Sequence, residues 1–182
     1  MREHGPWKIV RSHEVYRDPW LVLVRDDVIR PDGEPGSYIV AHLKPGVSVL
    51  AMAEDGDVYL TEEFHYGVGR VTIEAVSGGV EPGEDVLETA KRELREEAGL
   101  EATEWTDLGV VDPFTANVVS PTRLYLARGL SHVGQDLEGT ERIRTRKVPL
   151  AEAVRMTMES EITHGPSCVL ILKAASSLSL SR

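Results

Sequence analysis

The sequence has few of the features that mark secreted, membrane or nucleic-acid-binding proteins. Cys168 is the only cysteine among 182 residues, which excludes a disulfide bond within the chain. No uninterrupted apolar run reaches the roughly 18 residues that a membrane-spanning helix needs. The N-terminal segment MREHGPWKIVRSHEVYRDPW lacks the apolar centre of a secretory signal peptide. From these absences we expect a cytoplasmic protein that has no membrane partner.

Positive charge is also scarce. The chain has 30 acidic and 20 basic residues, which gives a formal net charge of −10 at pH 7. Because attraction to nucleic acid phosphates depends on a cationic surface, we expect no nucleic acid partner. An acidic protein can still bind a phosphorylated small molecule when metal ions lie between the two sets of negative charges.

What the sequence does contain is typical of a folded domain. Hydrophobic residues make up 41% of the chain, and there is no internal repeat or low-complexity linker. The length fits a single domain with a short N-terminal arm. Helix signals begin at Pro82–Glu84 and end at Gly99, where a left-handed C-terminal cap is expected.

The remaining pattern predicts strands before this helix, and further strands and helices after it. Periodicity and turn residues indicate hairpins over residues 21–30 with 37–43 and 47–53 with 58–64, and a strand over 67–76 that leads into a glycine loop before the helix. They also indicate strands over 106–112 and 123–130, and helices over 147–159 and 165–178. This order of elements favours an α+β fold in which helices pack on a sheet.

The segment GGVEPGEDVLETAKRELREEAGL, residues 78–100, carries an unusual cluster of acids. At about 100° per residue, Glu93, Glu96 and Glu97 share an arc of roughly 100° that borders the apolar stripe of the helix. Like charges at i and i+4, as at Glu93 and Glu97, are unfavourable unless a cation lies between them. Mg²⁺ prefers carboxylate and phosphate oxygens, so a metal site is one interpretation. A solvated acidic face is the other.

The same segment resembles the signature of the Nudix hydrolases, G-x5-E-x7-R-E-U-x-E-E-x-G-U, in which U is aliphatic. The chain matches every fixed position of that signature, with Gly78, Glu84, Arg92, Glu93, Leu94, Glu96, Glu97, Gly99 and Leu100. The preceding segment GVGRVTIEAVSGGVEPGE is similar to that of ADP-ribose and nucleoside-diphosphate-sugar pyrophosphatases. The chain departs from that group at Glu63-Phe64-His65, where relatives often have Gln-Tyr-Arg.

The resemblance implies a Nudix-type α/β/α sandwich with a central mixed β-sheet, preceded by an N-terminal antiparallel β-hairpin region. It implies an N-terminal strand region over residues 1–43, exchanged between subunits of a homodimer, and a Nudix hydrolase domain over 44–182. It further implies metal-dependent hydrolysis of the diphosphate in a small nucleotide substrate, ADP-ribose or a related nucleotide sugar. The alternatives are hydrolysis of nucleoside di- or triphosphates or dinucleotides, and a non-catalytic module that senses nucleotides.

The resemblance also assigns candidate residues. Mg²⁺ or Mn²⁺ would be bound by the Ser77 carbonyl and by Glu93, Glu96 and Glu97. The candidates for the general base lie in the acidic segment after the signature, with Glu141 first and Glu138 second, and Glu96 completes the catalytic set. The candidate substrate-binding residues are Trp20, His65, Arg70 and Glu74. For Trp20 and His65, ordinary structural roles in the β layer remain the alternative.

Overall fold

The computed structural model describes residues 1–137, 139 and 142–180. These residues form two compact units. Unit 1 contains Met1–Pro45 and Phe114–Ser120, and unit 2 contains the other described residues. The predicted boundary between residues 43 and 44 remains a prediction, and the residues 114–120 that pack with the N-terminal strands lie far beyond it in sequence.

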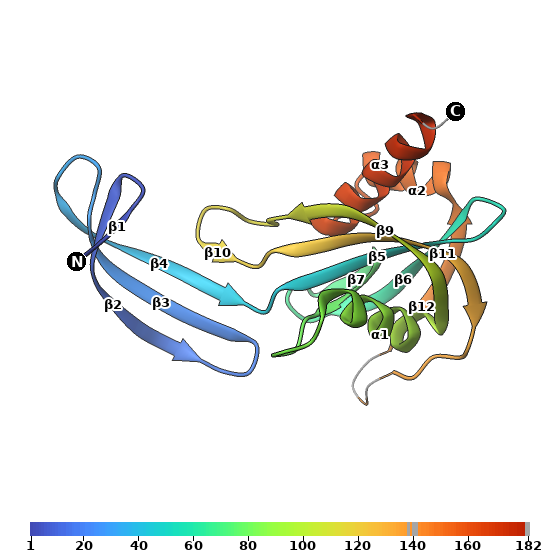
Figure 1. Ribbon diagram of the computed structural model, residues 1–182, viewed down its shortest axis with the longest axis horizontal. Helices are drawn as coiled ribbons and strands as arrows, with labels where there is room; N and C mark the ends of the chain where they lie inside the picture. Colours follow the sequence, from blue (N-terminus) through green and yellow to red (C-terminus); the bar gives the residue numbers. More distant parts are fainter. Residues whose placement is uncertain (138, 140–141, 181–182) are drawn as a thin grey trace. The chain divides into compact units, whose positions relative to one another are not determined.

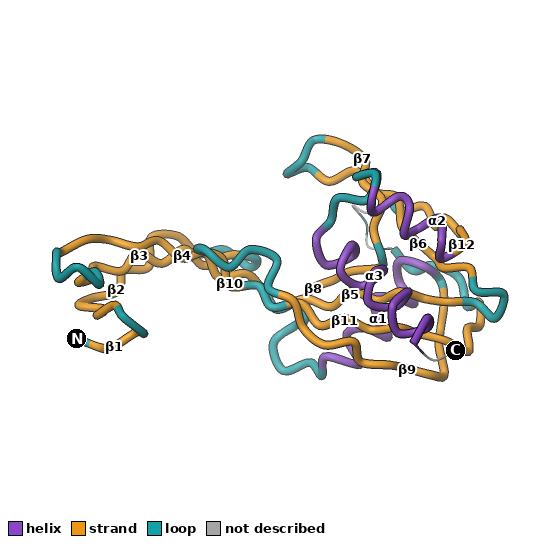
Figure 2. Tube along the Cα trace, turned by 90° about the horizontal axis from the view of Figure 1, so that it is seen from above, coloured by secondary structure: helices purple, strands orange, loops and turns teal. Residues whose placement is uncertain are grey.

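Unit 1 is built from strands and loops (Figure 2). Its five-stranded sheet has the order β1-β2-β3-β4-β10, in which β10 pairs parallel with β4 and the other neighbours are antiparallel. The sequence predicted β3 and β4, but not the long β2, because only one residue of β2 is buried and its pattern barely alternates. The strands are β1 (Arg2–His4), β2 (Trp7–Arg17), β3 (Leu21–Ile29), β4 (Pro35–Leu43) and β10 (Val118–Val119).

Unit 2 is centred on a seven-stranded mixed sheet. Its main path runs β12-β6-β5-β11-β9, with β7 beside β6 and β8 beside β5. Strands β5 and β11 are parallel, and the other pairs are antiparallel. The strands are β5 (Gly46–Met52), β6 (Asp57–His65), β7 (Arg70–Glu74), β8 (Val76–Gly79), β9 (Leu100–Val111), β11 (Thr122–His132) and β12 (Arg144–Pro149).

Helices cover both faces of this sheet (Figure 1). Helix α1 (Val86–Ala98) lies on one face, and α2 (Leu150–Met158) and α3 (Gly165–Leu180) lie on the other. Strand β5 supplies both cores because successive side chains of a strand point to opposite faces. Val49 packs in the core under α1, and Leu50 packs in the core under α2 and α3. The predicted α+β sandwich with a central mixed sheet and N-terminal antiparallel strands is confirmed.

Two local predictions were wrong. The helix predicted over 147–159 begins only at Leu150, because residues 144–149 pair with β6 and Pro149 occupies the N-cap. Gly78 and Gly79, expected in a loop before the helix, pair with β5 as part of strand β8. No helix among the described residues is long and apolar enough to cross a membrane.

Candidate active site

Helix α1 places two of the predicted metal ligands at the edge of its buried face. Asp85 caps the helix by accepting hydrogen bonds from the backbone N–H groups of Leu87 and Glu88. Gly99 ends it in the left-handed conformation (φ 66°), as predicted. Between these caps Glu93 and Glu97 are only 9% and 7% exposed. Two carboxylates one turn apart are therefore largely withdrawn from water, which argues against a simple solvated acidic face.

Strand β8 lies against this pair of carboxylates. The Ser77 N–H donates to Glu97 Oε2 over 3.4 Å. A Cβ on residue 78 would overlap the carboxylate of Glu93, so the absence of a side chain at Gly78 makes room for that carboxylate. The structure thus brings together Ser77, Glu93 and Glu97, which the sequence assigned to one metal.

Arg92 connects this group to the loop that precedes the helix. Its Nε donates to Glu84 Oε1 (3.0 Å), and its Nη1 lies 2.8 Å from both Glu93 Oε1 and Glu96 Oε2. Its Nη2 also donates to the main-chain oxygen of Gly79 (3.3 Å). These carboxylates raise the pKa of Arg92, with Glu84 contributing most. Arg92 therefore positions Glu93 and Glu96 and partly offsets their negative charge.

The ion pairs of Arg92 correct one prediction. With a helix that starts at residues 82–84, Glu84 falls in the first turn, and i, i+4 spacing pairs Arg92 with Glu88 and Glu96; only the pairing with Glu96 is found. Instead Glu84 precedes the helix and binds Arg92, and Glu88 pairs with Lys91 (2.7 Å). The Pro82–Gly83 turn, in which Gly83 has a φ of 84°, places Glu84 before the helix, and helical spacing does not predict such a turn.

The Glu84–Arg92 pair gives a test on stability. The hydrogen bond from Arg92 lowers the pKa of Glu84 from 4.5 to about 2. A lowered carboxyl pKa stabilises the fold above the unfolded-state value, and that contribution is lost as the pH falls from about 4.5 to about 2. We expect Glu84→Gln to reduce the free energy of unfolding by about 1–2 kcal/mol at pH 7, less than the full shift because water screens the pair.

Urea unfolding of both proteins between pH 7 and pH 2 would measure this difference. The gap between wild type and Glu84→Gln should narrow as the pH falls from about 4.5 to about 2. Glu101→Gln, at an exposed position of β9, is the matched control and should change stability little at any pH. A Glu84→Gln gap that stays constant down to pH 2 would contradict the assigned role of Arg92.

The oxygen donors fit a hard divalent cation. Mg²⁺ and Mn²⁺ favour one or two carboxylates with further oxygen ligands, and Glu93, Glu97 and the Ser77 carbonyl are of that kind. Among the described residues there is no group of three or more His, Cys, Asp or Glu side chains suited to a metal. A metal site made from the described residues therefore needs the backbone carbonyl, and oxygens from substrate or water, beside the two carboxylates.

The predicted substrate residues His65 and Glu74 lie together in a second group of unit 2. Glu74 accepts from Thr72 Oγ1 (2.6 Å), lies 3.2 Å from His65 Nε2, and lies 3.0 Å from His164 Nδ1. His164 also contacts Ser167 Oγ (2.8 Å). Burial lowers the pKa of His164, while the charge of Glu74 opposes that shift. Glu74 thus bridges two partly exposed histidines, whose side chains are 41% (His65) and 30% (His164) exposed.

The sequence analysis did not find His164 or Ser167. Both are about 90 residues from Glu74, and no local motif links them; only a search for His and Ser at the start of the last helix could have suggested them. Arg70, the cross-strand partner of His65, donates to Thr163 Oγ1 (2.7 Å). The β6–β7 hairpin is thereby joined to the segment that leads into α3.

Four candidates remain, and among the described residues only Glu96 is joined to the first group, through Arg92. Trp20 belongs to unit 1 and is 69% exposed. Glu138 and Glu141, the candidate bases, lie outside the described residues. Glu96 keeps its contact with Arg92. The roles of all four remain predictions.

The structure has the sandwich fold, and two buried glutamates of α1 lie beside strand β8, which ends in two glycines. This is the arrangement expected of a Nudix-type hydrolase. The NUDIX domain model matches residues 42–164, and the model of the nucleoside diphosphate sugar hydrolase N-terminal domain matches residues 7–40. The chain therefore belongs to the Nudix hydrolase family, whose members generally use divalent metal ions.

Two relatives and one solved structure show which members of the family this chain is similar to. An ADP-ribose pyrophosphatase of Mycobacterium tuberculosis (strain ATCC 25618 / H37Rv) is 30% identical over 167 residues, covering 90% of this chain and 80% of the relative. A CMP-5'-(N-acetyl-N-hydroxy-3-aminopropyl)phosphonate hydrolase of Streptomyces rubellomurinus (strain ATCC 31215) is 30% identical over 164 residues, covering 88% and 79%. The crystal structure of an ADP compounds hydrolase superposes with a TM-score of 0.84 at 20% identity, covering 100% of this chain and 98% of the other.

Proposed function

We propose that the protein hydrolyses the diphosphate of ADP-ribose or a related nucleotide sugar to a nucleoside monophosphate and a sugar phosphate. The observation that carries this proposal is the pair of buried carboxylates, Glu93 and Glu97, packed against the side-chain-free backbone at Gly78. The likeness to an ADP-ribose pyrophosphatase supports the choice of substrate.

We assign a role in this hydrolysis to each candidate residue. Glu93, Glu97 and the Ser77 carbonyl would hold Mg²⁺ or Mn²⁺, which when bound neutralises the diphosphate and lowers the pKa of an attacking water. Arg92 holds Glu93 and Glu96 in position. In the reaction, water adds to one phosphorus and the bridging P–O bond breaks. The proton of the water passes to a base, for which Glu141 and Glu138 are the candidates.

A second substrate class has its own support. His65 stands where relatives of the ADP-ribose group often carry an arginine, and its imidazole is 3.2 Å from Glu74. The relative from Streptomyces rubellomurinus is named for a CMP derivative that is not a sugar nucleotide. Nucleoside di- or triphosphates, dinucleotides and other nucleoside phosphate derivatives are therefore the alternative substrates.

We also propose that the protein is a cytoplasmic homodimer. Sedimentation at micromolar concentration tests the dimer.

Product analysis tests the proposal directly. The full chain with Mg²⁺ is incubated with ADP-ribose, other nucleotide sugars, dinucleotides and nucleoside triphosphates. We expect AMP and ribose 5-phosphate from ADP-ribose, with kcat/KM at least about tenfold above that for any triphosphate. Higher turnover of a triphosphate would replace the proposed substrate, and no turnover of any member would contradict the enzymatic function.

A further inference from the structure

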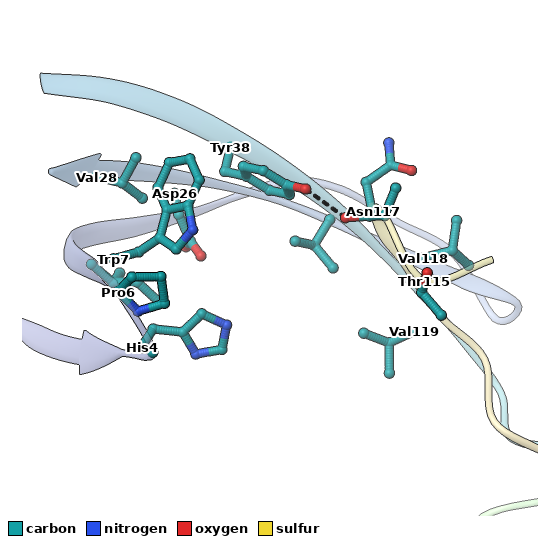
Figure 3. A pocket seen from close by; sticks show the side chains of 14 residues that line it. His4, Pro6, Trp7, Asp26, Val28, Tyr38, Thr115, Asn117, Val118 and Val119 are labelled. Atoms are coloured by element: carbon teal, nitrogen blue, oxygen red, sulfur yellow. Dashed lines mark hydrogen bonds between the residues drawn. The ribbon is translucent and has the colours of Figure 1, made fainter. Parts of the chain in front are cut away.

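Unit 1 contains a cavity that the proposed chemistry does not use. It measures about 440 Å³, within the range of small-ligand sites. It is lined from the β1–β2 turn, from β3 and β4, and from residues 115–119 (Figure 3). Pro6 and Trp7 form one side of it, and Thr115 and Val119 the opposite side. We call it the N-terminal cavity.

An aromatic pair forms part of its wall. The rings of Trp7 and Tyr38 meet edge to face, with centroids 5.5 Å apart. The Tyr38 hydroxyl donates to the main-chain oxygen of Ala116 over 2.6 Å (Figure 3). This bond joins the wall to the 115–119 segment and occupies the polar end of the tyrosine. The edge of one ring covers part of the face of the other, and the remaining ring surface lines the cavity.

Asp26 is the unusual residue of the lining. It interrupts an apolar stripe on one face of β3, where Val24 and Val28 are its neighbours two residues away on either side. Its Oδ1 is buried and has no hydrogen-bond partner among the described residues. A buried, unpartnered carboxylate oxygen is costly, and such groups in folded proteins call for a specific explanation.

No basic side chain of the described residues hydrogen-bonds to Asp26 Oδ1, and this includes His4, which lines the same cavity. His13 and Arg25 contact the neighbouring Asp27 instead: His13 Nε2 lies 2.8 Å from Asp27 Oδ2, and Arg25 Nη2 lies 3.7 Å from Asp27 Oδ1. Successive residues of a strand point to opposite faces of the sheet, so the contacts of His13 and Arg25 with Asp27 lie on the other face. Asp26 is left facing an aromatic, mainly apolar cavity.

We propose that the N-terminal cavity binds a small organic cation with N–H donors, a primary ammonium or a guanidinium. The N–H groups donate to the carboxylate of Asp26, which forms a charge-assisted hydrogen bond in surroundings poor in water. The cation also lies against the faces of Trp7 and Tyr38, whose rings attract positive charge. The lining of this cavity includes no residue of α1 or β8, so a failure of this proposal leaves the proposed hydrolase untouched.

The test is a titration of the ¹⁵N-labelled full chain, followed by the indole N–H signal of Trp7. The probes are 2-phenylethylammonium and agmatine, and 2-phenylethanol is the neutral match of the first. We expect saturable shifts with both cations, and at least tenfold weaker binding of the alcohol. Asp26→Asn should remove that difference, and Trp7→Leu should weaken both cations at least fivefold. Asp27→Asn, the matched control on the opposite face, should bind as the wild type does.

Several outcomes would overturn the proposal. Absence of a saturable shift with either cation, or wild-type binding by Asp26→Asn, removes the ammonium or guanidinium from the site. Equal affinity for the alcohol makes the cavity a purely apolar one. Adenosine binding in place of the amines assigns it to a nucleobase. If the Trp7 signal shifts with protein concentration alone and Asp26→Asn abolishes the shift, the cation is a side chain of a second copy. Should Asp26→Asn not fold, Trp7→Leu carries the comparison.

Discussion

Replacing Glu97 by glutamine is expected to lower kcat/KM for the diphosphate substrate by a factor of about 10³ or more, with little change in the fold. The side chain is 7% exposed and accepts a hydrogen bond from the Ser77 N–H. A glutamine has the same shape, and its amide oxygen can accept the same bond. The substitution therefore removes one negative charge from a buried oxygen-rich site. Steady-state kinetics with Mg²⁺, together with a Mn²⁺ binding titration, measures the loss.

Glu88→Gln is the matched control on the same helix. Glu88 is an exposed carboxylate that pairs with Lys91, so its loss should change kcat/KM by less than about twofold. In the wild type, a chelator should abolish turnover, and added Mg²⁺ should restore it. A Glu97→Gln enzyme that keeps more than a tenth of wild-type activity would show that Glu97 is no metal ligand. Activity that persists under chelation would remove the metal from the proposed reaction.

The sequence predicted the parts of the site that depend on helical spacing. The cap at Gly99 and the shared face of Glu93 and Glu97 follow from about 100° of rotation per residue and from the conformational freedom of glycine. Both are local properties, written within one segment of the chain. The same is true of the β3–β4 hairpin, which Gly33 marks by its turn.

The features that could not be predicted from the sequence depend on contacts between distant segments of the chain. Strand β8 is stabilised by pairing with β5, about 30 residues earlier, and its two glycines give no strand propensity. His164 is placed beside Glu74 by the packing of α3 on the sheet. Asp26 lines a cavity together with residues 115–119, about 90 positions further along the chain. Such juxtapositions are properties of topology, which a single sequence shows only where it carries a known motif.

Gly78 belongs to the signature and also packs against Glu93 of α1. Gly78→Ala is expected to reduce kcat/KM about 100-fold. The added methyl group would overlap the carboxylate of Glu93. The atoms in conflict are at the end of a flexible side chain, so that side chain moves before the backbone does. Displacing it also disturbs its 2.8 Å contact with Arg92. The loss therefore falls mainly on catalysis, with a cost of about 1–2 kcal/mol in the free energy of unfolding.

Gly67→Ala separates this effect from any general cost of removing a glycine. Gly67 lies in the β6–β7 turn of the same unit, and a Cβ there would meet nothing within 4 Å. Its activity and stability should match the wild type within about twofold and about 0.5 kcal/mol. If Gly78→Ala retained wild-type turnover, the position of Glu93 against β8 would be unimportant for the reaction. If it lost activity while Mn²⁺ binding stayed intact, Glu93 would act on the substrate or on the attacking water. Loss of both together is the result that a shared metal site on β8 and α1 requires.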